Sequence, residues 1–162
     1  MSMHLREPGF FPFPGGGPSE AAHVLNLPLR RGLSDETFLA LFHERVAPRL
    51  AAHAPQALLL QLGADGLAGD PVGLHWNLTP RAHCAVVAAA KQLCPRVLVL
   101  GGGGYHHPNT ARCWAAATHA ALDAAAPLPA QVPDSCPGFP SFGPDFDMHV
   151  RPLAHIADEN KL

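Results

Sequence analysis

The chain has 162 residues, of which 48% are apolar and 15% are charged, with a formal net charge of -2. This length suits one ordinary domain or a piece of a larger one, and the near-neutral charge argues against direct nucleic-acid binding. Charged residues make up roughly 25% of typical soluble domains, so we expect a partly apolar surface that a partner covers. The sequence shows no signal-peptide pattern and no apolar stretch long enough to span a bilayer. The four cysteines form no C-x-x-C pair, which indicates reduced thiols in an intracellular protein.

The first third of the chain predicts a loop, a strand and a helix. Residues 1–20 are rich in Pro, Gly and Phe, a composition that disfavours regular structure. Residues 23–29 predict a short strand. A helix is predicted to begin at Ser34 or Asp35 and to run to about residue 54. Its apolar stripe consists of Phe38, Phe42, Val46 and Leu50.

The remaining elements alternate between strand and helix. Residues 57–62 and 96–100 are apolar runs typical of strands buried on both faces. Thr79-Pro80 predicts a helix start, because a hydroxyl cap precedes a proline at the first helical position. A third helix is predicted from about 109 to 125, and the chain after residue 127 is Pro-rich and predicted to be irregular. The order predicts an α/β fold with a parallel sheet of about three strands and about three helices.

Two polar side chains follow the buried strands. Asp65 comes after the run 57–62, and Tyr105, the single tyrosine, comes after four consecutive glycines. The carboxyl ends of parallel strands are where α/β proteins place ligands. Taken alone, the glycine run is also typical of a tight turn, and Asp65 is also typical of a turn or a cap. A nucleotide-binding loop is a further reading, although the G-x-G-x-x-G spacing lacks the helix start and acidic residue that normally follow.

A set of short motifs carries a family resemblance, and their order and approximate spacing hold from Ser2 to about Pro152. The motifs are Pro8–Pro12, Asn26–Leu29 with Gly32 and Asp35-Glu36, Gln61–Asp65 with Gly69-Asp70, Asn77–Thr79, Leu100–Tyr105, Asn109–Trp114 and Phe142–Phe146.

Together these motifs resemble the C-terminal half of the catalytic domain of zinc-dependent histone deacetylases, of class I type, in the arginase/deacetylase superfamily. The resemblance implies the C-terminal part of a three-layer α/β/α domain over residues 1–152, with 1–20 as an active-site loop and 153–162 as a tail. It also implies hydrolysis of N-acetyl-lysine on zinc. By resemblance, Asp65 matches a zinc ligand, and Tyr105 matches the residue that stabilises the oxyanion.

The resemblance assigns further site residues. Phe10 and Phe11 match walls of the acetyl-lysine tunnel, although both could also be ordinary anchors of a loop on a core. The remaining matches are Val72 for the tunnel lining, Gly103 and Gly104 for the channel floor, and Ser2 with the Met3 carbonyl for a structural potassium ion.

The sequence departs from the family pattern in two ways. The His-His pair and the D-x-D-x-H-H segment, which carry the dyad and the other zinc ligands, are not in this sequence. Pro71 and Pro108 stand where relatives that bind inositol phosphate have arginines, so no inositol-phosphate-bridged complex is implied. His106-His107 and Asp147-x-His149 look like metal-binding pairs but do not match the dyad or ligand positions. We therefore expect this polypeptide by itself to be inactive.

Three functional hypotheses follow. The first is a partial lysine deacetylase domain, as a truncated isoform, a degraded gene copy or an incomplete gene model, whose full form acts on acetylated proteins such as histones in the nucleus or cytoplasm. The second is a non-catalytic interaction module that pairs with the missing half or another chain. The third is half of an amidohydrolase for small acetylated amides, as in acetylpolyamine and acetoin-utilisation relatives.

Overall fold

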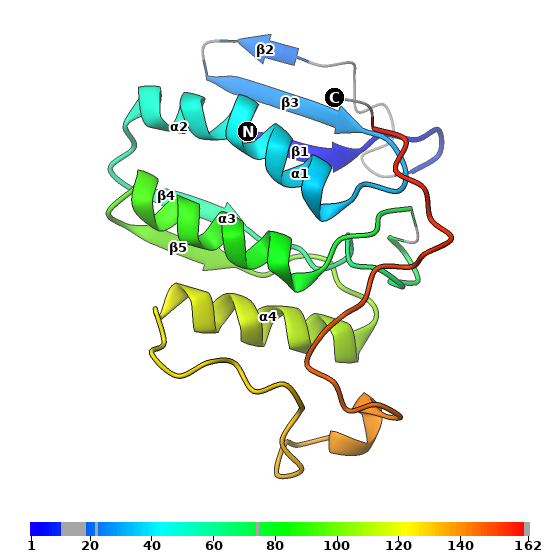
Figure 1. The fold of residues 1–162 in the computed structure, drawn as a ribbon. Coiled ribbons are helices and arrows are strands. Elements are labelled where there is room, and N and C mark those ends of the chain that lie inside the picture. Colours follow the sequence, from blue (N-terminus) through cyan, green and yellow to red (C-terminus); the bar gives the residue numbers. More distant parts are fainter. Residues whose placement is uncertain (11–18, 22, 74, 161–162) are drawn as a thin grey trace.

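The structure is a computed structural model that describes residues 1–10, 19–21, 23–73 and 75–160. Its strands form two sheets, a three-stranded sheet in the order β1-β3-β2 and a two-stranded sheet β4-β5. β1 runs parallel to β3 and β4 parallel to β5, whereas β2 is antiparallel to β3. The four parallel strands point to the same end of the molecule (Figure 1). The strands are β1 (Ser2–Leu5), β2 (Ser19–Ala21), β3 (Val24–Leu29), β4 (Leu58–Gln61) and β5 (Val97–Leu100).

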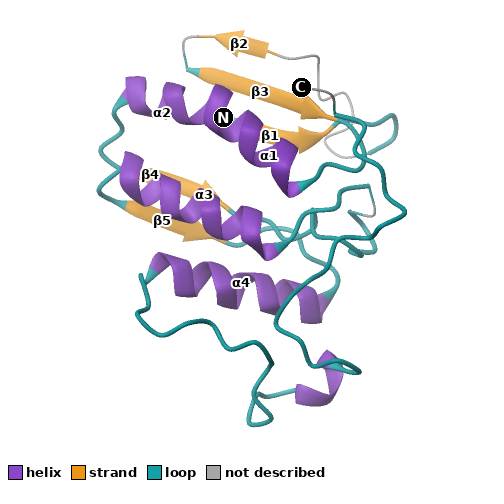
Figure 2. Ribbon diagram, in the orientation of Figure 1, coloured by secondary structure: helices purple, strands orange, loops and turns teal. Residues whose placement is uncertain are grey.

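Helices follow β3, β4 and β5, as the alternation of strands and helices predicts (Figure 2). Ser34 caps the first of them and Thr79 caps the helix that begins with Pro80, both through side-chain oxygens that accept a backbone N–H. No helix in the described ranges is long and apolar enough to cross a membrane. The helical elements are α1 (Asp35–Leu41), the π-helix η1 (Phe42–Val46), α2 (Ala47–His53), α3 (Pro80–Leu93), α4 (His107–Ala121) and the 3-10 helix η2 (Phe139–Phe142).

The predicted α/β class with parallel pairing is confirmed, but the strand count was too low. Ser2–Leu5 lies inside the segment 1–20 that was predicted as loop, and Ser19–Ala21 begins within it. Ser2–Leu5 contains neither Pro nor Gly, and its strand arises from pairing with β3 some two dozen residues later. Such a non-local partner leaves no signal in a four-residue stretch.

The predicted helix from 34 to 54 is present, but its middle is a π-helix. The physical reason lies at Pro48, which follows directly in α2. In a regular α-helix a proline ring clashes with the carbonyl four residues earlier, here that of Glu44, and donates no hydrogen bond to it. The wider π-turn removes this conflict.

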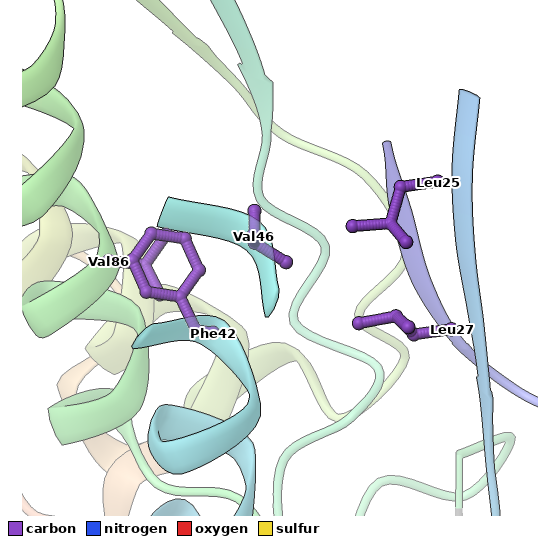
Figure 3. Packing of buried hydrophobic residues seen from close by; sticks show 5 residues of the cluster. All are labelled: Leu25, Leu27, Phe42, Val46 and Val86. Carbon is purple, nitrogen blue, oxygen red and sulfur yellow. The ribbon is translucent and has the colours of Figure 1, made fainter. Parts of the chain in front are cut away.

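The main core lies between the first sheet and the helices. Figure 3 shows its buried members converging from β3, η1 and α3. The predicted stripe is confirmed, since Phe42 and Val46 are buried and Phe38 and Leu50 pack against them. The five labelled side chains are Leu25, Leu27, Phe42, Val46 and Val86.

The β4-β5 sheet is covered on one face only. Leu60 and Val99 pack under α3 and α4, whereas Leu59 and Leu98 on the opposite face are 68% and 55% exposed. The prediction that these strands are buried on both faces is therefore wrong for the described residues. Both faces are apolar, but no second helical layer covers the other one here.

The C-terminal segment crosses back to the first sheet. The side-chain amide of Asn77 donates to the Leu153 carbonyl and accepts the Leu153 N–H. Asp158 accepts the N–H of Ser34 at 2.9 Å, and Asn160 accepts the N–H of Arg30 at 2.7 Å. The chain after residue 127 is irregular, as predicted, apart from the short 3-10 helix η2. Its last described residues are tied to residues more than 120 positions earlier.

Candidate active site

The loops that follow β4 and β5 lie side by side. The parallel register of the two strands pairs Gln61 with Leu100. The pairing continues beyond the strands, because the Leu62 N–H donates to the Leu100 carbonyl at 2.8 Å and the Ala64 N–H donates to the Gly103 carbonyl at 2.6 Å. The loops that carry Asp65 and Tyr105 therefore both begin at the carboxyl ends of β4 and β5, at the same end of the sheet (Figure 1).

Asp65, in the loop after β4, is half-buried and lies directly against Gly103. A side-chain methyl at Gly103 would overlap the Asp65 carboxylate. Partial burial raises the pKa of Asp65 above its usual value; a backbone hydrogen bond opposes this shift, the charge of Asp70 adds to it, and His83 opposes it. His83 itself is buried, and its Nε2 lies 2.9 Å from the Gly63 carbonyl oxygen.

Asp70 connects the two loops. Its side chain is 1% exposed. Oδ1 accepts the N–H groups of Val72 and Gly73 at 2.9 and 2.8 Å. Oδ2 accepts the N–H groups of Tyr105 and His106 at 2.6 and 3.1 Å. Each carboxylate oxygen thus takes two backbone donors from one loop.

Tyr105 projects from the end of the glycine run, with 52% of the residue exposed. The preceding Gly104 has a φ of +143°, and a side chain there would meet the Thr110 hydroxyl oxygen at 2.6 Å. That hydroxyl is buried and has no hydrogen-bond partner in the part of the chain that the structure describes. His106 follows as the N-cap of α4, where its Nδ1 accepts the Asn109 N–H at 3.2 Å.

An apolar floor lies beneath the two loops. Ala64, Leu67 and Cys113 form one buried cluster. Burial raises the pKa of the Cys113 thiol to about 12, and the neighbouring Cys84 and Asp35 add to the shift. Cys113 therefore stays protonated at neutral pH, and we interpret it as a packing residue.

Phe10 and Val72 lie on loops that a small cluster joins. The Phe10 ring meets the His75 ring edge-on with centroids 5.7 Å apart. His75 Nδ1 lies 3.6 Å from a Glu7 carboxylate oxygen, and Glu7 also pairs with Arg31. Val72 lies in the same loop as His75 and is exposed. Phe11 lies outside the described residues. The tunnel roles of Phe10, Phe11 and Val72 stay predictions.

Ser2 and Met3 lie on β1, in the first sheet, where they pair with Asn26 and Leu27. The Ser2 hydroxyl is 3.0 Å from His4 Nδ1, and the Met3 side chain packs against the core. Their role in binding potassium stays a prediction.

Among the residues of this site, Asp65 has a side chain that suits a zinc ligand. Carboxylate oxygens of Asp are common zinc ligands, and catalytic sites use three protein ligands with one open position. Asp65 provides such a carboxylate at a strand end. Within the described ranges, however, no three His, Cys, Asp or Glu side chains are grouped so that they could hold a metal ion.

Asp70 is the site residue that the sequence interpretation missed as a functional candidate. One local signal was present, because an Asp followed by Pro often accepts the N–H groups two and three residues ahead. The bond to Tyr105 spans 35 residues, and nothing in the local sequence reports it.

A family model and similar curated proteins all point to the same family. The family described as Histone deacetylase domain matches residues 1–121. The chain is 37% identical to histone deacetylase 8 of Xenopus tropicalis over 157 residues, which cover 94% of this chain and 42% of that protein. It is also 37% identical to histone deacetylase 1 of Homo sapiens over 141 residues, which cover 85% of this chain and 28% of that protein. The chain thus spans less than half the length of these relatives.

Proposed function

Because the chain belongs to the histone deacetylase family, we propose that it supplies the Asp65–Tyr105 half of a zinc-dependent lysine deacetylase site. The complete site would hydrolyse N-acetyl-lysine in proteins, histones among them, to lysine and acetate. The observation that carries the proposal is the continued pairing of the two loops, Ala64 N–H to the Gly103 carbonyl, beside the motifs that resemble the family's. Family membership supports an intracellular protein of the nucleus or cytoplasm.

Each residue has a separate task in this proposal. Asp65 would hold zinc through a carboxylate oxygen, with other ligands from polypeptide that carries the His-His and D-x-D-x-H-H motifs. Bound zinc supplies a polarised carbonyl and an activated water. Tyr105 would donate its hydroxyl to the carbonyl oxygen as negative charge builds there. Gly103 and Gly104 would form the channel floor by letting the backbone lie close to Asp65 and Thr110, where a side chain would overlap them.

Two variants test the assignment in a complex where a second polypeptide supplies both motifs. Tyr105→Phe keeps the ring but removes one oxyanion donor, a loss that typically lowers kcat about 100- to 1000-fold. Affinity for a hydroxamate zinc binder should largely remain. Asp65→Ala removes a metal ligand, so zinc content and activity should fall together.

Metal analysis and turnover of both variants are compared with Asp134→Asn, a change at an exposed loop aspartate. A fully active Tyr105→Phe, or an Asp65→Ala that keeps full zinc, contradicts the assignment. The 162-residue chain alone should hold no stoichiometric zinc after dialysis, because it offers one matched ligand.

The exposed apolar face of the β4-β5 sheet favours a second candidate, a non-catalytic interaction module. Leu59, Leu98 and Leu100 are all large and exposed on these strands. A module of this kind would bind another chain whether or not zinc is present. A stoichiometric partner retained with Asp65→Ala and Tyr105→Phe, without deacetylation, would favour this candidate.

A further inference from the structure

The buried Asp70 carboxylate lies between two segments that are far apart in the sequence. Its four acceptor contacts are all to backbone N–H groups, two in the loop after β4 and two at the end of the glycine run after β5. The residue is 1% exposed, so bulk water does not compete with the carboxylate for these contacts in the folded chain. Carboxylate oxygens accept hydrogen bonds at shorter distances and more strongly than neutral oxygens do.

The Tyr105 segment needs such a fixed point. Gly101–Gly104 has no side chain with which to anchor itself, and glycine loses more conformational freedom on ordering than any other residue. The Tyr105 ring is half exposed and lies outside the four core clusters of the described residues. The shortest of the Asp70 contacts, 2.6 Å, is to the N–H of Tyr105 itself.

We infer that Asp70 is a positioning residue for Tyr105: one buried carboxylate fixes the tyrosine backbone to the loop that follows Asp65. The inference rests on the proposed function for its catalytic meaning. Positions of reacting groups matter to about 1 Å, and a hydroxyl that must reach a developing oxyanion has to start from a fixed backbone. Asp70 acts through Tyr105 and touches neither substrate nor metal in this proposal.

The chemistry of the carboxylate explains why an amide cannot replace it. Asn at position 70 would keep one acceptor oxygen but direct an NH₂ group at two N–H donors. One of the two pairs, that at Val72 and Gly73 or that at Tyr105 and His106, would then lose its acceptor, and the link between the two loops would be broken in either case. The neighbouring loop residues keep their sequence, so the change isolates the acceptor.

The test uses the 162-residue chain labelled with 3-fluorotyrosine, which reports on Tyr105 alone because it is the single tyrosine. In Asp70→Asn the fluorine signal should shift and broaden or split, as Tyr105 samples several positions. Amide hydrogen exchange at Tyr105 and His106 should quicken about tenfold, while exchange in α3 stays unchanged. Asp134→Asn, at an exposed aspartate, is the matched control.

The outcomes separate positioning from a general structural role. An unchanged fluorine signal in a folded Asp70→Asn overturns the inference, and so does exchange that quickens equally throughout the chain. If Asp70→Asn does not fold, the parent chain decides: unprotected amides at Tyr105 and His106 overturn the inference, and protection shared with Val72 and Gly73 supports it. Neither measurement involves zinc or substrate, so a failure of the proposed deacetylase function is detected separately by turnover.

Discussion

At the scale of single residues, the contact between Asp65 and Gly103 defines the candidate site. Gly103 does not have the positive φ of Gly104, so an alanine there is compatible with the backbone. What excludes a side chain at Gly103 is the space that the Asp65 carboxylate occupies. The glycine is needed for close approach, not for an unusual turn.

Gly103→Ala should therefore lower the free energy of unfolding by about 1–3 kcal/mol, the range for overpacking a tight site. In an Asp65→Ala background the same change should have an effect below about 0.5 kcal/mol, because the overlapping group is gone. Urea unfolding of the two single variants and the double variant measures this coupling. Additive effects of the two changes would mean that Gly103 meets something other than Asp65.

The sequence predicted the positions of Asp65 and Tyr105 in the fold, but it did not predict the hydrogen bonds that connect their loops. Asp65 and Tyr105 were expected after apolar strands, and the structure confirms that they follow β4 and β5. Their chemical roles stay predictions. The Asp70 bridge could not be predicted, because a carboxylate that accepts backbone N–H groups across a fold has no periodic or motif signature.

At the scale of elements, the α-helices and the strands β3, β4 and β5 were predicted, whereas β1 and β2 were missed. The stripe of Phe38, Phe42, Val46 and Leu50 repeats every four residues, so local spacing alone identifies its helix. β1 has four residues and exists through its pairing with β3. The irregular C-terminal segment is likewise held by non-local bonds, and its Asp158 carboxylate is a central acceptor. Burial opposes ionisation of Asp158, but hydrogen bonds from Ser34, Asn160 and Thr37 together lower its pKa below the usual value.

Asp158→Ala should lower the free energy of unfolding by about 1–2 kcal/mol at pH 7, since the Ser34 N–H loses its acceptor. Because the folded-state pKa is depressed, this contribution is fully present above the usual value of 3.8 and is lost as pH falls through the lower folded-state pKa. Urea unfolding at pH 7 and in acid, with Glu159→Ala as the exposed neighbouring control, measures it. A difference between parent and Asp158→Ala that persists unchanged in acid would exclude this role.

At the scale of the whole molecule, the β4-β5 sheet is the least complete part. Two-stranded sheets are marginally stable on their own, and this one also presents an uncovered apolar face. An apolar groove of about 280 Å³ lies at the other side of β5, against α4. Both features are consistent with a chain that spans less than half the length of its relatives.

The chain alone should therefore self-associate, through exposed leucines and unpaired strand edges. Leu59 and Leu98 are register partners in the sheet, and Leu59→Lys with Leu98→Lys places two like charges on that face. Sedimentation should show the parent as concentration-dependent oligomers and the double variant shifted towards monomer. Leu122→Lys, at an exposed position at the end of α4, is the control. Leu122 lines the groove, so an equal effect of this variant would mean that the chains do not associate specifically through the Leu59 and Leu98 face.

The bonds between the C-terminal segment and the turn after β3 also set an order of events during synthesis. Asp158 and Asn160 bind residues made 124 and 130 positions earlier. At the usual ribosomal rate of about 5–20 residues per second, the turn at Arg30–Ser34 waits about 6–25 seconds for these partners. During that interval its N–H groups depend on water or on a chaperone. Until residues 158–160 are made, the backbone N–H groups of Arg30 and Ser34 lack these acceptors, and the turn stays open to proteases.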